Sequence, residues 1–285
     1  MLDPDWPFTP VILWAAIVGL VVLLILRSIR KDRREYQRFK RYRTTLKRQA
    51  MFRKWLRESF LTFGGLSVAI LLLAGRFVGP LLASVQEWPP VAGLRSAIAF
   101  NVGVTVGIVS GVVIAFVAIT VLGIVASRKE KDVATIGDIA AMLPRNRQEV
   151  VLGGLLSVNA GVVEELMFRL ALPALIFGAS GSSIAAVVGS LALFGALHLY
   201  QGVAGILGTA FVGSLMFLLY VVTGSIAAPI IAHALFDLRS LVLLPVTVFG
   251  AHKIDGRVQK FIPRPVPSRQ APERLPQGPP TSSGG

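Results

Sequence analysis

The chain has 285 residues, of which 54% are hydrophobic and only 15% are charged. Its mean hydropathy is +0.69. Soluble domains carry about a quarter of charged residues, so this composition excludes a soluble domain and indicates a polytopic membrane protein. Cysteine is absent, which excludes disulfides and thiolate metal sites. The formal net charge is +14, and residues 27–57 alone hold 14 Lys and Arg. Because this block follows an apolar segment, it indicates a cytoplasmic flank rather than a nucleic-acid interface.

Seven apolar windows are long enough to be membrane spans, which need about 20 residues each. The third window has 29 residues and is long enough to contain a break. Short hinges separate the last four windows, so we expect these four to form one compact bundle. The sequence therefore predicts an all-α polytopic integral membrane protein with about seven transmembrane helices. The windows are residues 8–26, 60–83, 98–126, 150–177, 182–199, 203–223 and 226–249.

The distribution of Lys and Arg predicts the orientation. The block 27–57 places the first loop in the cytoplasm and the N-terminus outside. Seven crossings then place the basic segment 127–149 and the C-terminal tail inside. No small-residue cleavage site follows the first span, which favours a retained anchor over a signal peptide. We expect a prokaryotic plasma-membrane protein with four parts: an anchor and basic linker at 1–58, two helices at 59–127, a compact helical bundle at 128–250 and a disordered Pro-rich basic tail at 251–285.

The basic linker carries apolar and aromatic residues at helical spacing. These are Tyr36, Phe39, Tyr42 and Leu46. A basic helix with one apolar face is typical of a segment that lies on an anionic lipid surface. The sequence therefore predicts an interfacial helix across residues 31–58.

Ionisable side chains recur inside the last four apolar windows. Each ionised residue near the centre of a membrane helix costs about 2.5–3.5 kcal/mol. Without compensation, the four charged residues Glu164, Glu165, Arg169 and Asp237 would together cost on the order of 10 kcal/mol. Such residues indicate a functional site by default. They form three clusters on three predicted helices: Glu164, Glu165 and Arg169; His198; and His233 with Asp237.

Spacing indicates how these residues pair within each helix. Glu165 and Arg169 are four residues apart, so they share a helix face and are expected to form an ion pair. Glu164 is rotated by about 100° from Glu165 and has no such partner, which makes it the candidate functional carboxylate. The same four-residue spacing places Phe194 on the face of His198, and His233 on the face of Asp237. Arg239, Tyr200 and His252 give no signal of a role.

The three clusters together resemble the CPBP family of intramembrane proteases, which includes CAAX prenyl endopeptidases and bacteriocin-processing (Abi) proteins. The family signature resembles Glu-Glu-x-x-x-Arg, then Phe-x-x-x-His, then His-x-x-x-Asn or Asp. Here these motifs are EELMFR at 164–169, FGALH at 194–198 and HALFD at 233–237. The resemblance covers about residues 140–245 and implies an intramembrane endopeptidase, with Glu165, Arg169 and Phe194 as structural or orienting residues.

Peptide hydrolysis needs an activated water and a stabilised oxyanion. We expect Glu164 to accept the proton of the water and His198 to position that water, as the resemblance also implies. His233 and Asp237 would face the oxyanion, although an ionised Asp cannot donate a hydrogen bond. Alternatively, a zinc ion would be held by Glu164, His198, His233 and Asp237. The sequence lacks His-Glu-x-x-His, and both the metal-free route and the zinc route remain open.

Two other classes of function compete with an endopeptidase. One is a non-catalytic membrane immunity or scaffold protein in which the buried polar cluster is structural. The other is a proton- or ion-coupled transporter, which would more often show two related halves. For a protease, the expected partners are membrane lipids and a membrane-associated peptide or protein substrate, for which a CAAX-like peptide is one option. No nucleic-acid partner is expected.

Overall fold

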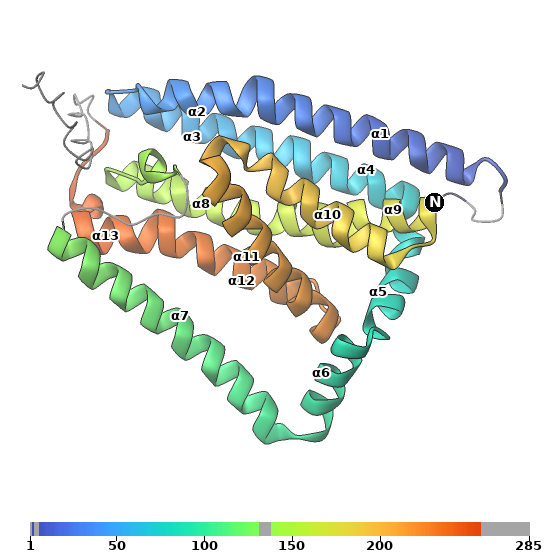
Figure 1. Cartoon of the computed structure of the whole chain (residues 1–285). Coiled ribbons are helices and arrows are strands. Elements are labelled where there is room, and N and C mark those ends of the chain that lie inside the picture. The colour runs from blue at the N-terminus through green and yellow to red at the C-terminus, as the bar shows by residue number, and fades with distance from the viewer. Residues whose placement is uncertain (1, 3–5, 131–137, 258–285) are drawn as a thin grey trace, which may run out of the picture.

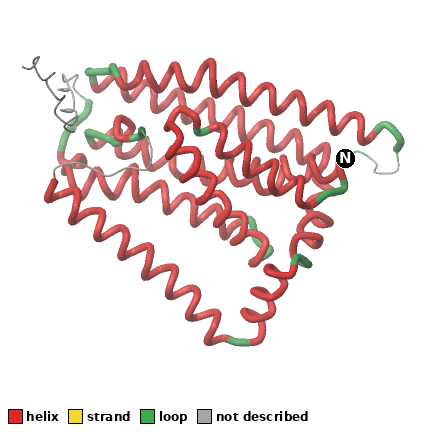
Figure 2. Tube along the Cα trace, viewed as in Figure 1, coloured by secondary structure: helices red, strands yellow, loops and turns green. Residues whose placement is uncertain are grey.

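The computed structural model describes residues 2, 6–130 and 138–257, and within these ranges every regular element is a helix (Figure 2). The N-terminal half contains α1 (Thr9–Arg27), η1 (Ser28–Asp32), α2 (Arg33–Lys40), α3 (Thr45–Ser59), η2 (Phe60–Gly64), α4 (Gly65–Ala74), η3 (Gly75–Phe77), α5 (Val78–Gln86), α6 (Pro89–Phe100) and α7 (Val102–Glu130). The C-terminal half contains η4 (Ala140–Met142), α8 (Arg147–Glu165), η5 (Leu166–Ala171), α9 (Leu172–Ser180), α10 (Ser183–Leu197), η6 (Leu199–Gln201), α11 (Gly202–Thr223), α12 (Ala227–Leu238), η7 (Arg239–Leu243), α13 (Leu244–Phe249) and η8 (Ala251–Lys253).

Several elements join end to end into long rods (Figure 1). Five helical segments are long and apolar enough to cross a membrane. The 15 residues of α10 form a shorter apolar helix, and α8, η5 and α9 form the segment that carries the first motif. The prediction of an all-α polytopic membrane protein is therefore confirmed, with a helix count close to the seven expected. The five segments are Thr9–Lys40, Thr45–Gln86, Val102–Arg128, Leu199–Thr223 and Ala227–Phe249.

The third predicted window does contain a break. Helix α6 ends at Phe100 and α7 begins at Val102, while Asn101 between them has an extended backbone. The side chain of Asn101 accepts a hydrogen bond from the backbone N–H of Val104 at 3.2 Å. An asparagine in this position caps the start of a helix, so the chain turns here and α7 runs alone along one side of the molecule (Figure 1).

Wider π-helical turns interrupt two of the C-terminal rods just before a proline. Element η5 leads into Pro173, and η7 leads into Pro245. Proline has no backbone N–H, so the carbonyl four residues earlier loses its usual helical partner. The helix widens by one residue there instead of ending. In η5 this wide turn lies immediately after Glu164 and Glu165.

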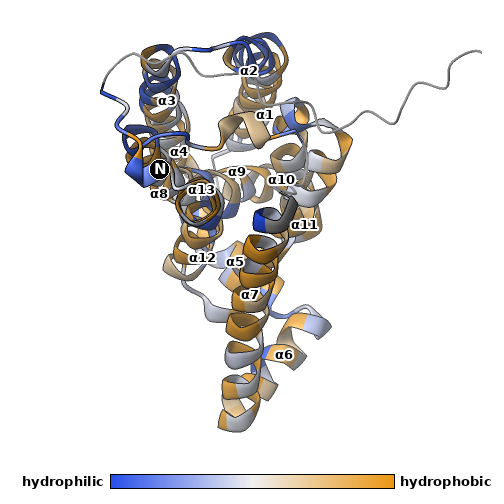
Figure 3. Ribbon diagram, turned by 90° about the vertical axis from the view of Figure 1, so that its left-hand side faces the viewer, coloured by the Kyte–Doolittle hydropathy of each residue, from blue (hydrophilic) through white to orange (hydrophobic). Residues whose placement is uncertain are grey.

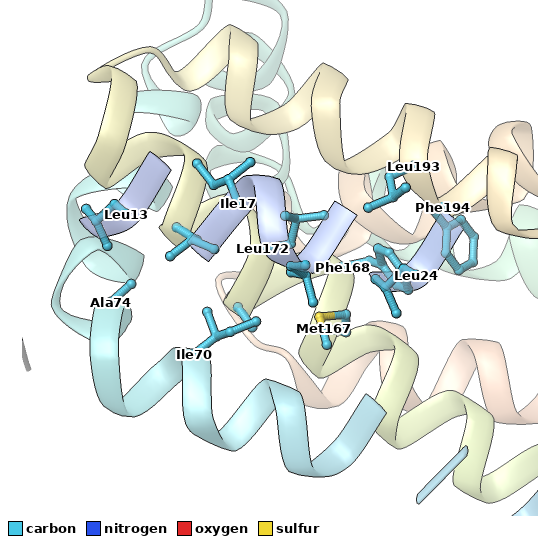
Figure 4. Packing of buried hydrophobic residues seen from close by; sticks show 13 residues of the cluster. Leu13, Ile17, Leu24, Ile70, Ala74, Met167, Phe168, Leu172, Leu193 and Phe194 are labelled. Atoms are coloured by element: carbon cyan, nitrogen blue, oxygen red, sulfur yellow. The ribbon is translucent and has the colours of Figure 1, made fainter. Parts of the chain in front are cut away.

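The first-motif segment lies at the centre of the largest apolar cluster (Figure 4). Residues of η5 and α9 are enclosed by α1, α4 and α10. Met167 and Leu172 are fully buried, and Phe168 is 1% exposed. Because packed apolar contacts surround this segment, the backbone that carries Glu164 and Glu165 is held rigidly.

The basic linker forms an antiparallel pair of helices, α2 and α3, rather than a lone interfacial helix. Tyr36 and Phe39 are buried in the protein, and the Phe39 ring contacts the rings of Phe52 and Trp55 at 5.5 and 4.8 Å between centroids. The prediction that these two residues face lipid is therefore wrong, since the apolar face of α2 covers α3. Hydrophilic residues of this pair gather at one end of the molecule (Figure 3).

A buried ion pair fastens this helical pair to the C-terminal bundle. Arg48 on α3 is 1% exposed and Glu149 on α8 is 0% exposed, and their charged atoms lie 3.0 Å apart. The Arg48 guanidinium also donates to the carbonyl oxygens of Ala141 and Leu143. Asn146 caps α8 by accepting a hydrogen bond from the Glu149 N–H at 3.0 Å. Most Lys and Arg residues of the block 27–57 are exposed, whereas Arg48 is buried and has a structural role.

The predicted disordered tail lies almost entirely outside the described residues, since the description ends at residue 257. The part of it that is described, residues 251–257, returns to the bundle and is ordered, so the prediction of disorder is wrong for these residues. Ile254 accepts a hydrogen bond from the Arg147 N–H at 2.9 Å, and Gly256 accepts one from Gln49 at 2.8 Å. The end of the described chain is therefore packed against both α3 and the start of α8.

Candidate active site within the helical bundle

A close approach between α8 and α12 brings the first and third motifs together. A side chain at Gly161 would place its Cβ 3.0 Å from the backbone N of Ala234 and the backbone O of Ile230. Only glycine allows the two backbones to lie this close. Glu165 follows Gly161 by about one turn on α8, and His233 precedes Ala234 on α12, so this contact sets the distance between these two side chains.

Glu165 binds both Arg169 and His233. Its Oε2 lies 2.9 Å from Arg169 Nε, and its Oε1 accepts a hydrogen bond from Arg169 Nη2 at 3.2 Å. The same Oε1 lies 2.7 Å from His233 Nδ1. Both Glu165 and Arg169 have fully buried side chains. The ion pair expected from the spacing is present, and it also orients an imidazole on another helix, which spacing within one helix could not predict.

His233 lies between two carboxylates. Its Nδ1 is bonded to Glu165, and its Nε2 lies 3.7 Å from Asp237 Oδ2, one turn further along α12. An acceptor at Nδ1 holds the proton of a neutral imidazole on that nitrogen and leaves the lone pair on Nε2. Asp237 is about one-third exposed, so it forms the open side of this row of groups.

His198 occupies the C-terminal end of α10, where its Nδ1 lies 2.8 Å from the carbonyl oxygen of Phe194. A carbonyl can only accept, so Nδ1 carries the proton and Nε2 is free to accept one. The Phe194 ring contacts the His198 ring at 5.1 Å and the His233 ring at 6.5 Å between centroids. Phe194 therefore packs against both imidazoles. The Arg169 guanidinium lies over its ring at 5.0 Å.

Glu164 differs from its neighbour in having no fixed partner. Among the described residues it makes no hydrogen bond or ion pair, and its side chain is only partly buried. It does lie within electrostatic range of His233 and Asp237. No direct hydrogen bond joins Glu164 to His198 in the described part of the chain. Glu164 is thus an unengaged carboxylate beside the third motif, as its rotation from Glu165 predicts.

The set Glu164, His198, His233 and Asp237 does not fit a metal ion as it stands. In the described ranges, no group of three or more His, Asp or Glu side chains is arranged to hold one. Phe194 packs against both imidazoles, and a shared ion would need both Nε2 atoms within about 2.1 Å of it.

Tyr200 lies in this site, although no sequence pattern selects it. It belongs to η6, the short turn that follows His198, and its ring is 6.0 Å from the His198 ring at an angle of 32°. Tyr200 also lies within electrostatic range of Glu164 and Asp237. The only sequence signal is its position two residues after His198, just before the turn at Gly202.

The first rod of the chain supports this turn from outside the motifs. Ser28 Oγ on η1 donates to the carbonyl oxygen of Leu197 at 3.0 Å. The Tyr36 ring contacts the Tyr200 ring at 5.4 Å, and the Tyr36 hydroxyl donates to the carbonyl of Asp138. Asp138 in turn donates its N–H to the carbonyl of Gln201 at 3.0 Å. The backbone on both sides of His198 is therefore held by Ser28 of η1, Tyr36 of α2 and Asp138.

Arg239, to which the sequence assigned no role, joins α7 to the bundle. Its Nε donates to Thr120 Oγ1 at 2.9 Å, and its Nη2 lies 3.4 Å from the carbonyl oxygen of Ile119. Such a bond to a distant helix is not detectable from sequence spacing. Arg239 stabilises the position of α7 and is not part of the site.

The fold and site define an integral membrane helical bundle with a buried acid–histidine cluster. Residues 146–239 match a family model described as Rce1-like, type II CAAX prenyl endopeptidase Rce1-like. All three motifs lie within the matched segment, so the resemblance to the CAAX protease family is confirmed, and it supports a protease of the CAAX endopeptidase kind. No curated protein and no solved structure matches the chain.

Proposed function

We propose that this protein is an intramembrane endopeptidase that hydrolyses a peptide bond of a membrane-associated substrate, with Glu164 as the general base. One observation carries the proposal. Of two adjacent acids, Glu165 is fully engaged by Arg169 and His233, whereas Glu164 has no partner among the described residues. A carboxylate without an ion-pair partner in an apolar bundle is free to take a proton from water.

The reaction begins with attack by a water oxygen on the carbonyl carbon of the scissile bond. Glu164 accepts the proton that this water loses, and His198, through its free Nε2, accepts a hydrogen bond that positions the water. When the tetrahedral intermediate collapses, the C–N bond breaks and protonated Glu164 returns the proton to the leaving amine. The immediate products are a carboxylic acid and an amine, and Glu164 regains its charge. The acid then gives its proton to the amine, so the products leave as a carboxylate and an ammonium group.

His233 and Asp237 are proposed to line the side of the site where the carbonyl oxygen becomes negative. Glu165 supports this role, because its bond to Nδ1 fixes the orientation of the His233 ring. An imidazolium can donate from Nε2 to the oxyanion. Asp237 lies beyond that nitrogen at 3.7 Å and contributes by orienting the ring, since an ionised carboxylate would repel the oxyanion.

The zinc alternative leads to a different experimental result. If Glu164, His198, His233 and Asp237 held zinc, removal of metal by a chelator would abolish hydrolysis and added Zn²⁺ would restore it. The metal-free route predicts that the purified, metal-depleted enzyme keeps its rate. Atomic absorption on the same sample reports whether depletion was complete.

A second candidate function is a membrane immunity or scaffold protein in which the cluster only holds helices together. The connection of Glu165 to both Arg169 and His233 favours it, because this network joins α8 to α12 without any catalytic role. In that case Glu164→Gln leaves the biological function intact, whereas loss of Arg169 lowers the amount of folded protein.

The proposed partners follow from the location of the site. The substrate is a membrane-embedded or membrane-delivered peptide or protein, of which a prenylated CAAX-like peptide is the first to test because the matched family model has that description. Anionic lipids are proposed to contact exposed arginines of α2, such as Arg34 and Arg38. The site is proposed to open toward the cytoplasm of a prokaryotic cell, where these arginines would lie.

The deciding experiment compares protein N-termini in membranes from cells that express the wild type, Glu164→Gln or Glu87→Gln at matched levels. Glu87 is an exposed acid far from the site and serves as the matched control. We expect new N-termini with the wild type and with Glu87→Gln, and none with Glu164→Gln. Identical profiles for all three, together with a phenotype that survives in Glu164→Gln, would favour the scaffold function.

A further inference from the structure

In the proposed chemistry, no neutral hydrogen-bond donor has yet been assigned to the oxyanion. The oxyanion needs donors aimed at it, but Glu164 and Asp237 are acceptors when ionised. His233 uses Nδ1 for Glu165, and His198 uses Nδ1 for the Phe194 carbonyl. A donor that keeps its proton at neutral pH without needing a charge would complete the site.

Tyr200 is such a donor, and its hydroxyl is already polarised. A phenol has an unperturbed pKa of about 10 and so holds its proton at neutral pH. The hydroxyl oxygen of Tyr200 accepts a hydrogen bond from Gln201 Nε2 at 2.9 Å. Among the described residues its own proton has no acceptor. A hydroxyl that accepts one hydrogen bond becomes a stronger donor for the next.

The ring of Tyr200 is held on the side of the catalytic histidine. It lies 6.0 Å from the His198 ring and is supported on another side by Tyr36 at 5.4 Å. The turn that carries it is fixed by the hydrogen bond from Asp138 to Gln201 and by that from Ser28 to Leu197. A side chain fixed in this way loses little entropy when it binds substrate, which is the condition for a preorganised donor.

We propose that Tyr200 is a further catalytic residue, whose hydroxyl donates a hydrogen bond to the scissile carbonyl oxygen as that oxygen becomes negative. This inference rests on the proposed function. The phenol keeps its proton throughout. Water adds to the carbonyl carbon, Glu164 takes the water proton, the oxyanion is stabilised by the Tyr200 O–H, and the proton on Glu164 passes to the leaving amine as the C–N bond breaks.

The role also fits an Asp rather than an Asn at position 237. An Asn in that position can donate to an oxyanion, and an ionised Asp cannot. With Tyr200 as donor, the site does not depend on residue 237 for this hydrogen bond. Asp237 is then free to act on His233, from which it is 3.7 Å away.

The test measures hydrolysis of a farnesylated fluorogenic CAAX peptide by purified full-length protein in lipid nanodiscs. Tyr200→Phe should lower kcat by about 10²–10³-fold, the usual effect of removing one oxyanion donor, and should leave KM nearly unchanged. Tyr220→Phe is the matched control, because Tyr220 is a buried tyrosine on α11 that packs against Phe217. It should retain wild-type kinetics, and Glu164→Gln should be inactive.

A binding measurement separates a catalytic role from a structural one. A farnesylated peptide aldehyde, whose hydrate resembles the tetrahedral intermediate, should lose affinity for Tyr200→Phe by about the same factor as kcat. A non-cleavable N-methyl amide of the same peptide should bind equally to both proteins. Equal weakening of both ligands would overturn the proposal, because it would mean that the phenol only supports the fold of the site.

Two outcomes distinguish a failure of the Tyr200 role from a failure of the proposed endopeptidase function. If Glu164→Gln is inactive and Tyr200→Phe cleaves at nearly the wild-type rate, the role of Tyr200 is wrong and the endopeptidase stands. If neither the peptide nor membrane proteins are cleaved by the wild type, both fail. Should Tyr200→Phe not fold, 4-aminophenylalanine and 4-methylphenylalanine at position 200 replace it, and only the first, which keeps a donor, should be active.

Discussion

At the scale of single residues, Glu165 and Glu164 show how adjacent acids acquire different roles. Glu165 faces Arg169 on its own helix and His233 on α12, and all three are buried. Glu164 lies beside this network, and none of its members forms a hydrogen bond with it. A rotation of about 100° along one helix is therefore enough to make one carboxylate structural and leave the other available for chemistry.

Arg169 should be essential for stability rather than for substrate contact. Removing one partner of a buried ion pair costs about 3–5 kcal/mol, because the remaining charge is left without compensation. We expect Arg169→Gln to lower the free energy of unfolding in detergent by about that amount. Arg53→Gln, at an exposed position on α3, should change it by less than about 0.5 kcal/mol. Equal stability of the two variants would show that His233 alone compensates Glu165.

The residues of the site could be selected from the sequence only where contacts run within one helix. The pairs Glu165–Arg169, Phe194–His198 and His233–Asp237 are each four residues apart, and helix geometry alone brings such residues together. The contact between Glu165 and His233 depends instead on the close approach at Gly161. Tyr200 lies in a short turn with no repeating pattern, so its proximity to His198 appears only in the folded protein.

At the scale of elements, the α2–α3 pair is a structural part of the bundle and not a loose linker. Its exposed bases fit the composition of a cytoplasmic flank, which explains why the sequence indicates an interfacial helix. The difference arises from α3, whose Phe52 and Trp55 cover Phe39. A pattern within one helix cannot reveal whether lipid or another helix covers its apolar face.

The contact between α3 and α8 should depend on the pair of Arg48 and Glu149. Arg48→Met leaves the buried carboxylate of Glu149 without its main charged partner, and we expect a loss of about 3–5 kcal/mol in the free energy of unfolding. The double variant Arg48→Met and Glu149→Met should recover a large part of this loss, because an apolar pair of similar volume replaces a buried ion pair at little cost. Thermal unfolding in detergent measures both. A double variant no more stable than Arg48→Met would show that the hydrogen bonds of Arg48 to Ala141 and Leu143 matter more than the charge pair.

At the scale of the whole molecule, three basic segments that are far apart in the sequence meet at one end. Lys40 of α2 forms an ion pair with Asp138 at 2.5 Å. Arg147 bonds to Ile254, and Gln49 bonds to Gly256. The turn between α2 and α3, the start of α8 and the end of α13 lie together in Figure 1. A single end of the bundle therefore carries the charge that the sequence assigns to the cytoplasm.

This arrangement predicts which positions share a side of the membrane. The chain has no cysteine, so single cysteines can be introduced without background. Lys47→Cys on α3 and Lys253→Cys on η8 are both exposed and should react with an impermeant maleimide only when the cytoplasmic face is open to the reagent. Basic flanks remain on the cytoplasmic side.

The matched probe at the other end is Ser180→Cys, an exposed position at the C-terminal end of α9. It should react in right-side-out vesicles, in which the two Lys variants stay unlabelled, and the pattern should reverse in inverted vesicles. If Lys47→Cys and Lys253→Cys label from opposite faces, the crossings between them are odd in number and the shared basic end is wrong. If both label from outside, the end is correct but the orientation is reversed, and the site would then open away from the cytoplasm.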